Sequence, residues 1–159
     1  MGTVYATRKF TFSAAHRYWR DEWTPDENAR VFGQLTVVHG HNYVLEVTVR
    51  GLVDARTGMV MDLGELKRLV GEAVLARFDH ADLNRDALFA SGSVPTTENL
   101  VRVVWELLAP KLGASACTGC ASGKTRPSTS STSAHEGPLR HAALSRERRP
   151  PAGEPRAVR

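Results

Sequence analysis

The chain has 159 residues, enough for one modest hydrophobic core but hardly for two. No apolar run approaches the roughly 18 residues that a membrane span needs, so we expect no membrane contact. Residues 1–116 contain no cysteine, from which we expect a cytoplasmic location. The formal net charge of +4 is unevenly spread, since residues 1–116 carry 13 basic against 14 acidic side chains and residues 117–159 carry 8 against 3. The positive excess therefore lies in the C-terminal segment, and we expect no nucleic-acid binding by the domain.

Two strands are predicted in the first third of the chain. Residues 4–16 alternate between apolar and polar side chains, with aromatic residues and, at the strand end, His16 on one face. Residues 17–38 follow as a long polar loop. Alternation resumes over residues 39–50, which predicts a second strand.

The second strand opens on His39-Gly40-His41. Side chains at i and i+2 of a strand share a face, so His39 and His41 project side by side. With His16 from a neighbouring strand end they form a cluster of three imidazoles. Three histidines with an open fourth position are typical of a catalytic zinc site. Taken alone, two hydrogen-bonded histidines beside a core explain the His-x-His pattern equally well.

Two amphipathic helices are predicted after the strands. The first begins at Asp62, whose Asp-x-x-Glu spacing suits an N-cap, and has an apolar stripe at helical spacing. The second begins at Thr96 or Thr97 and ends at Pro110. Strands followed by helices predict one α+β domain over residues 1–116.

Asp79-His80 lies between the two predicted helices. A carboxylate beside an imidazole can fix the tautomer of the ring and raise its basicity, which suits proton transfer near neutral pH. A loop histidine next to a capping aspartate is the simpler interpretation, and the residues alone favour it.

Four motifs then occur in one order. They are Phe12-Ser13-Ala14-Ala15-His16, His39-Gly40-His41-Asn42-Tyr43, Asp79-His80-Ala81-Asp82-Leu83-Asn84 and Pro95-Thr96-Thr97-Glu98-Asn99-Leu100. Over residues 4–112 the chain resembles the 6-pyruvoyltetrahydropterin synthase and 6-carboxytetrahydropterin synthase family. The resemblance implies the tunnelling fold, an antiparallel sheet with two helices on one face. It also implies a homo-oligomer in which subunits join their sheets into a hexamer-like barrel.

The same resemblance implies roles for individual residues. Zn²⁺ would be the cofactor, the Asp-His pair would be catalytic, and the start of the second helix would help to hold the pterin ring. The residues concerned are His16, His39 and His41 for the metal, Asp79 and His80 for catalysis, and Thr96, Thr97 and Glu98 for the substrate.

The implied activity is that of a zinc-dependent lyase acting on 7,8-dihydroneopterin triphosphate. Loss of a two-carbon aldehyde gives 6-carboxytetrahydropterin, used towards queuosine, and this carbon-carbon cleavage is the product we favour. Elimination of triphosphate, a carbon-oxygen cleavage, gives the 6-pyruvoyl product used towards tetrahydrobiopterin and is the alternative.

One departure from the family pattern concerns the base. Family members place a cysteine a few residues before the paired histidines, where its thiolate removes a proton. Here residues 33–38 read Gly-Gln-Leu-Thr-Val-Val, and neither Leu nor Val ionises. The chain also lacks a recognisable pterin-anchoring acid after the second helix. A non-catalytic zinc-binding member of the family, inactivated by the missing cysteine and the altered C-terminus, is therefore a competing interpretation.

Helical periodicity and family resemblance end together near Ala116. Residues 117–159 are rich in Ser, Thr, Pro, Gly and Arg, which predicts a disordered basic tail and a sheet that lacks its last two strands. Cys117 and Cys120 form a single Cys-x-x-Cys, a weak indication of a redox or metal site without a partner pair.

We predict that residues 117–159 are read in a shifted frame. Residues 116–130 can be back-translated with GC-rich codons. When the reading begins one base before the Cys117 codon, the same bases encode LHRVRLWE followed by DPTLYV. That is strand, turn and strand, resembles the missing hairpin of the family, and supplies its pterin-anchoring glutamate. The nucleotide sequence around Ala116 is the measurement. Stop codons in the alternate frame would contradict the prediction and leave a genuine basic extension.

Overall fold

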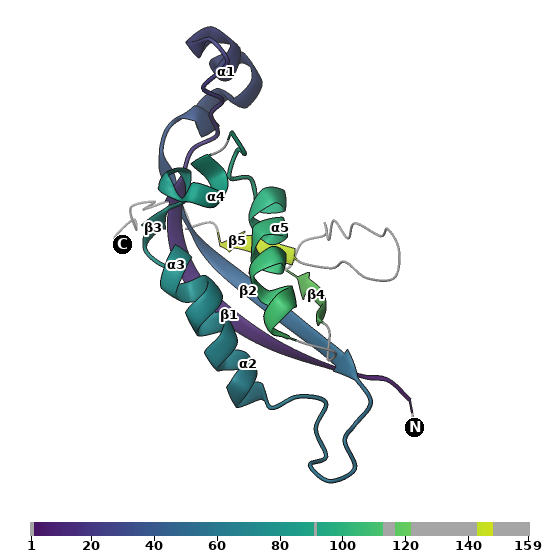
Figure 1. Cartoon of the computed structure of the whole chain (residues 1–159). Helices are drawn as coiled ribbons and strands as arrows, with labels where there is room; N and C mark the ends of the chain where they lie inside the picture. The colour runs from purple at the N-terminus through teal and green to yellow at the C-terminus, as the bar shows by residue number, and fades with distance from the viewer. Residues whose placement is uncertain (1, 91, 113–116, 122–142, 148–159) are drawn as a thin grey trace, which may run out of the picture.

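The computed structural model describes residues 2–90, 92–112, 117–121 and 143–147 (Figure 1). None of the helices among these residues is both long and apolar enough to cross a membrane. In chain order the elements are β1 (Val4–His16), α1 (Pro25–Phe32), the 3₁₀ turn η1 (Gly33–Thr36), β2 (His39–Gly51), α2 (Leu63–Val70), the π-helical η2 (Gly71–Leu75), α3 (Ala76–Phe78), β3 (Ala81–Asp82), the 3₁₀ turn η3 (Leu83–Arg85), α4 (Ala87–Ala90), α5 (Thr97–Leu108), the 3₁₀ turn η4 (Ala109–Lys111), β4 (Cys117–Ala121) and β5 (Ala143–Glu147).

The sheet is built around the long antiparallel pair β1 and β2. Pairing runs without a break from Val4 opposite Gly51 to His16 opposite His39. On its other edge β1 carries the short parallel strand β3, which gives the order β3-β1-β2-β4. The two predicted strands are thus confirmed, and each extends over 13 residues.

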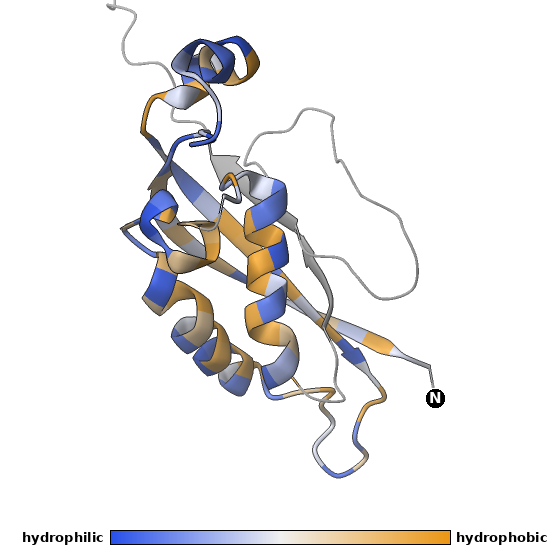
Figure 2. Ribbon diagram, turned by 45° about the horizontal axis from the view of Figure 1, so that its top comes forward, coloured by the Kyte–Doolittle hydropathy of each residue, from blue (hydrophilic) through white to orange (hydrophobic). Residues whose placement is uncertain are grey.

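The core lies between one face of this sheet and the helices α2 to α3 and α5, which cover it side by side (Figures 1 and 2). Figure 2 shows the apolar side of these helices turned towards the sheet. Alternation along β1 and β2 sends every second side chain into this layer, as predicted. The buried strand residues on this face are Phe10, Phe12, Ala14, His16, Tyr43, Leu45, Val47 and Val49, while Val44 is buried on the other face.

The first predicted helix is interrupted by a π-helical segment, η2. Leu66, Val70, Val74 and Phe78 are fully buried and follow one another at intervals of four residues. In an α-helix of about 3.6 residues per turn, each such step rotates the side chain by about 40° from the last. The wider π turn offsets this drift, so all four side chains stay on the core face.

The predicted polar loop over residues 17–38 is partly wrong, because it contains α1. Thr24 and Glu27 form a capping box: Thr24 Oγ1 accepts from Glu27 N at 3.2 Å, and the Glu27 carboxylate accepts from Thr24 N at 2.9 Å. The fully buried Asn28 fastens the helix, accepting from Arg20 N and donating to Arg20 O. Thr-Pro-x-Glu was the signal available in the sequence.

The structure also differs from the expectation that strands are lacking after α5. β4 pairs with Glu46–Val49 and β5 with Asn42–Leu45, so both lie along the same edge of β2. Strand pairing uses backbone groups, which any extended segment offers, whereas the sequence pattern reports side chains. Both strands fall within residues 117–159, for which the sequence predicts a disordered tail, and the rest of that range lies outside the described residues.

Leu66 and Leu52 provide a matched test of the core. Leu66 is fully buried between α2 and the sheet, whereas Leu52 is 66% exposed. Leu66→Ala should lower the free energy of unfolding by about 2–5 kcal/mol, because it leaves a cavity. Leu52→Ala should change it by no more than about 0.5 kcal/mol. Urea denaturation followed by circular dichroism measures both, and equal effects would contradict this packing.

Candidate metal centre and active site

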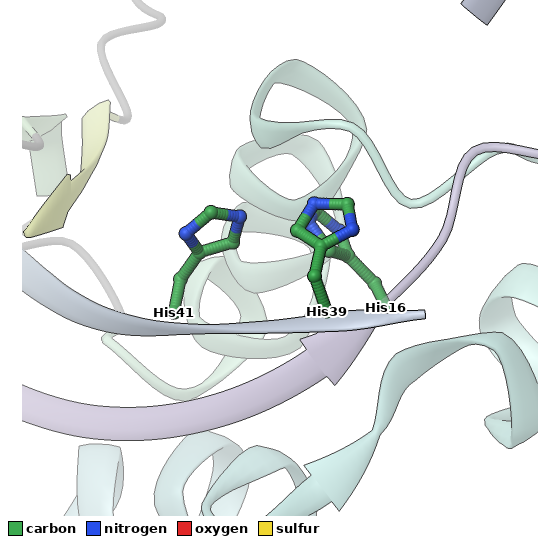
Figure 3. Close-up of side chains that lie close together, drawn as sticks. All are labelled: His16, His39 and His41. Atoms are coloured by element: carbon green, nitrogen blue, oxygen red, sulfur yellow. The ribbon is translucent and has the colours of Figure 1, made fainter. Parts of the chain in front are cut away.

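The strand register places three histidines at one end of the sheet (Figure 3). His16, the last residue of β1, lies directly opposite His39, the first residue of β2. His41 lies two residues further along β2, on the same face. Gly40 between them points away, so the cluster follows from a period of two on one strand and a terminal residue on the other.

The three imidazoles converge on one point, as Figure 3 shows. Their ring centroids are 4.7 Å apart for His16 and His39, 5.1 Å for His16 and His41, and 4.9 Å for His39 and His41. One nitrogen from each ring lies within 4.8 Å of the others. The sequence-based prediction that these residues come together is confirmed, and the group could hold a metal ion.

Hydrogen bonds orient two of the rings for this role. His16 Nδ1 lies 2.7 Å from the Pro95 carbonyl oxygen, and His39 Nδ1 lies 2.7 Å from that of Val37. A carbonyl only accepts, so Nδ1 donates in both rings and Nε2 keeps its lone pair. His39 Nε2 is buried without a hydrogen-bond partner among the described residues. A ring held by its Nδ1–H with a buried lone pair fits a metal ligand.

The start of α5 supports His16 from behind. Thr96 is the N-cap of this helix, and its Oγ1 accepts from Asn99 N at 3.2 Å. Thr96 N and Asn99 Nδ2 both donate to the Val94 carbonyl, at 2.7 and 2.8 Å, which holds the backbone on either side of Pro95. Thr96 therefore lies beside the metal cluster. The role predicted for Thr96, Thr97 and Glu98 in holding a pterin ring stays a prediction.

Asp79 and His80 form a second group, anchored to β1. Asp79 Oδ1 accepts from Ser13 N at 2.9 Å and lies 3.0 Å from His80 Nδ1, while His80 N donates to Ser13 O at 2.6 Å. The Ser13 N–H, with a smaller contribution from His80, lowers the pKa of Asp79 below its usual range. The ionised carboxylate therefore accepts from His80 Nδ1–H and leaves Nε2 free to exchange a proton.

His80 has an unusual backbone conformation. Its φ of 59° makes it the one non-glycine residue with a positive φ in the part of the chain that the structure describes. Such a conformation costs free energy and persists only where the surrounding contacts enforce it, often at functional sites. Here the Ser13 backbone enforces it and turns the imidazole, 82% exposed, towards solvent.

A cavity of about 370 Å³ opens beside this imidazole. Thr11, Ser13 and Asn42 line it together with Asp79 and His80, and Ser13 Oγ donates to Asn42 Oδ1 at 2.9 Å. Thr11 and Ser13 alternate with the buried residues of β1, so the cavity lies against the sheet face opposite the three histidines. Within one chain the structure does not bring the two groups together. Sequence reasoning named neither Asn42 nor the Pro95 carbonyl as part of a site.

Residues 33–38, just before His39, contain no cysteine and no acidic side chain. Leu35 lies in η1 with its side chain 38% exposed, and its carbonyl accepts from Tyr18 N at 2.8 Å. Leu35 therefore cannot act as a base at this position.

Comparison with known proteins links these features to a family. The family model described as 6-pyruvoyl tetrahydropterin synthase matches residues 5–146. A 6-pyruvoyl tetrahydrobiopterin synthase of Dictyostelium discoideum is 42% identical over 110 residues, which cover 69% of this chain and 82% of the relative. A putative 6-carboxy-5,6,7,8-tetrahydropterin synthase of Archaeoglobus fulgidus is 45% identical over 74 residues, covering 46% and 58%.

The fold gives the same result. The solved 6-pyruvoyl tetrahydropterin synthase of Caenorhabditis elegans superimposes with a TM-score of 0.67 at 37% identity, over 72% of this chain and 83% of that one. This likeness confirms the predicted α+β tunnelling-fold architecture, with helices on one face of the sheet. The chain belongs to the 6-pyruvoyl tetrahydropterin synthase family, whose members are lyases.

Proposed function

We propose that this protein is a zinc-dependent lyase that converts 7,8-dihydroneopterin triphosphate to 6-pyruvoyltetrahydropterin, in the cytoplasm. The observation that carries the proposal is the three-histidine cluster, whose rings point toward one another and in two cases are held by carbonyl oxygens. The names of the Dictyostelium and Caenorhabditis relatives support the pyruvoyl product better than the carboxy product that the sequence alone led us to favour. The Archaeoglobus relative keeps 6-carboxytetrahydropterin as the second candidate.

His16, His39 and His41 would hold the zinc. A bound zinc ion supplies Lewis acidity, which stabilises negative charge on substrate hydroxyl oxygens. The chain's own contribution is to hold each ring by its strand position and, for His16 and His39, by a carbonyl acceptor. Thr96, Thr97 and Glu98 would position the pterin ring from the start of α5.

His80 would move protons, because Asp79 holds its Nδ1 and the residue lines the cavity. The His80 cavity and the histidine cluster lie on opposite faces of one sheet, so neither contains the whole chemistry. We therefore expect a homo-oligomer in which the His80 cavity of one copy meets the metal cluster of another. A small pterin triphosphate is the expected ligand, with no role for nucleic acid or membrane.

The competing function is that of a non-catalytic zinc-binding family member. It is favoured by one specific observation, the absence of a cysteine or carboxylate over residues 33–38. Both functions bind zinc, so turnover of dihydroneopterin triphosphate distinguishes them.

We expect about one zinc per chain. Loss of a group that only hydrogen-bonds to a metal ligand lowers metal affinity by up to roughly 100-fold. His41→Ala should lower the zinc affinity by more than this, because it removes a ligand. Zinc content by atomic emission spectroscopy, with chelator competition, is the measurement. His80→Ala is the matched control, because His80 lies on the other face of the sheet and should leave zinc binding unchanged. Unchanged zinc content in His41→Ala would overturn the ligand assignment.

Turnover should be well below that of cysteine-bearing relatives, because a positioned general base contributes about 10²–10⁴-fold. Mass spectrometry of the products distinguishes pyruvoyl from carboxy tetrahydropterin. Leu35→Cys should raise the rate, and His80→Ala should abolish what remains. High activity in the unmodified protein would show that another group serves as the base, whereas no turnover by either the unmodified protein or Leu35→Cys would favour the non-catalytic function.

A further inference from the structure

Asn84 holds the residue that directly follows the metal-cluster residue His16. Its Oδ1 accepts from Arg17 N at 2.8 Å, and its Nδ2 donates to Arg17 O at 3.0 Å. One side-chain amide thus meets both backbone groups of Arg17, which is the pairing that a neighbouring strand would give. Neither the histidine cluster nor the Asp79–His80 pair includes this residue.

The two bonds continue the backbone pairing along the edge of β1 that faces away from β2. His80 N donates to Ser13 O, and β3 then pairs in parallel with Ala14 and Ala15. At η3 the backbone turns away, where Asp82 Oδ1 accepts from Asn84 N at 3.1 Å. The Asn84 side chain takes over where backbone pairing stops, and the fully buried Leu83 beside it anchors the turn in the core.

His16 is consequently fixed from three directions. Its backbone pairs with His39, its ring donates to Pro95 O, and the chain leaving it is held by Asn84. Without Asn84, the backbone after β1 would lose its two side-chain hydrogen bonds at the point where the fully buried His16 imidazole must stay aligned with two others. Ring alignment of this kind determines metal affinity.

We propose that Asn84 is a positioning residue for the metal site, acting through the Arg17 backbone, and that it ties the segment carrying His80 to the zinc ligand His16. The proposal rests on the metal function proposed above and extends it to a residue outside the ligand set. The side chain at this position must accept one hydrogen bond and donate another, and it must be long enough to reach both backbone groups of Arg17. Aspartate keeps the acceptor but would set a carboxylate oxygen against the Arg17 carbonyl, and alanine offers neither group.

The experiment measures metal binding on the full chain without relying on turnover. Zinc affinity is determined by chelator competition, and the visible absorption spectrum of the Co²⁺-substituted protein reports ligand geometry. We expect Asn84→Ala to weaken zinc binding by roughly tenfold or more and to alter the Co²⁺ spectrum. Asn84→Asp should show a loss in the same direction, because its carboxylate oxygen faces the Arg17 carbonyl although the bond to Arg17 N is kept.

Asp54→Ala is the structural control. Asp54 Oδ1 accepts from Arg56 N and Thr57 N, both at 2.8 Å, in the turn that follows β2 at the far end of the sheet. This variant likewise loses two side-chain-to-backbone bonds, so it should lower the melting temperature yet leave zinc affinity and the Co²⁺ spectrum unchanged. A merely structural role of Asn84 predicts the same result for Asn84→Ala.

Folded Asn84→Ala protein with unchanged affinity and spectrum would therefore overturn the inference. If Asn84→Ala does not fold, the same two measurements on Asn84→Asp decide, with a loss supporting the inference and no change overturning it. An unmodified protein that binds neither Zn²⁺ nor Co²⁺ would instead refute the metal function itself. The two failures are distinguishable because one is seen in the variant and the other in the parent protein.

Discussion

The pairing of β1 with β2 is the constraint on which the rest of the structure depends. Because side chains alternate along a strand, a slip of one residue between these strands would remove His16 from the face of His39 and His41. It would also turn Phe10 and Phe12 away from the helices. The register that buries the core is therefore the same register that assembles the metal cluster, and neither can change alone.

Strand β1 serves both chemical groups, one through a side chain and the other through its backbone. Its inward side chains end in His16, while the backbone of Ser13 binds Asp79 and His80 at the strand edge. The distance between the two groups is consequently set by a rigid strand rather than by a loop. This arrangement suits a site completed between copies, since each copy presents both halves in a fixed relation.

The histidine cluster was predictable because its signal is a period of two, which a strand converts directly into shared orientation. The core face of β1 and β2 followed from the same rule. The carbonyl of Pro95 and the amide of Asn84 were not predictable, since their partners lie 79 and 67 residues away and the contacts involve backbone atoms. β4 and β5 were not predicted from the sequence for a related reason, because their pairing with β2 does not depend on side-chain pattern.

The π-helical segment η2 makes the length of the first core-covering helix matter. Without the exposed Glu72, the buried residues would follow one another at intervals of four, three and four, which a regular α-helix buries without difficulty. The core alone therefore has no need of the additional residue. Asp79 does need the additional residue, because a shorter helix would carry its carboxylate out of reach of the Ser13 N–H. The number of residues between the start of α2 and Asp79 is thus a dimension of the active site, even at a position such as Glu72 whose side chain lies on the solvent side and pairs with Arg68.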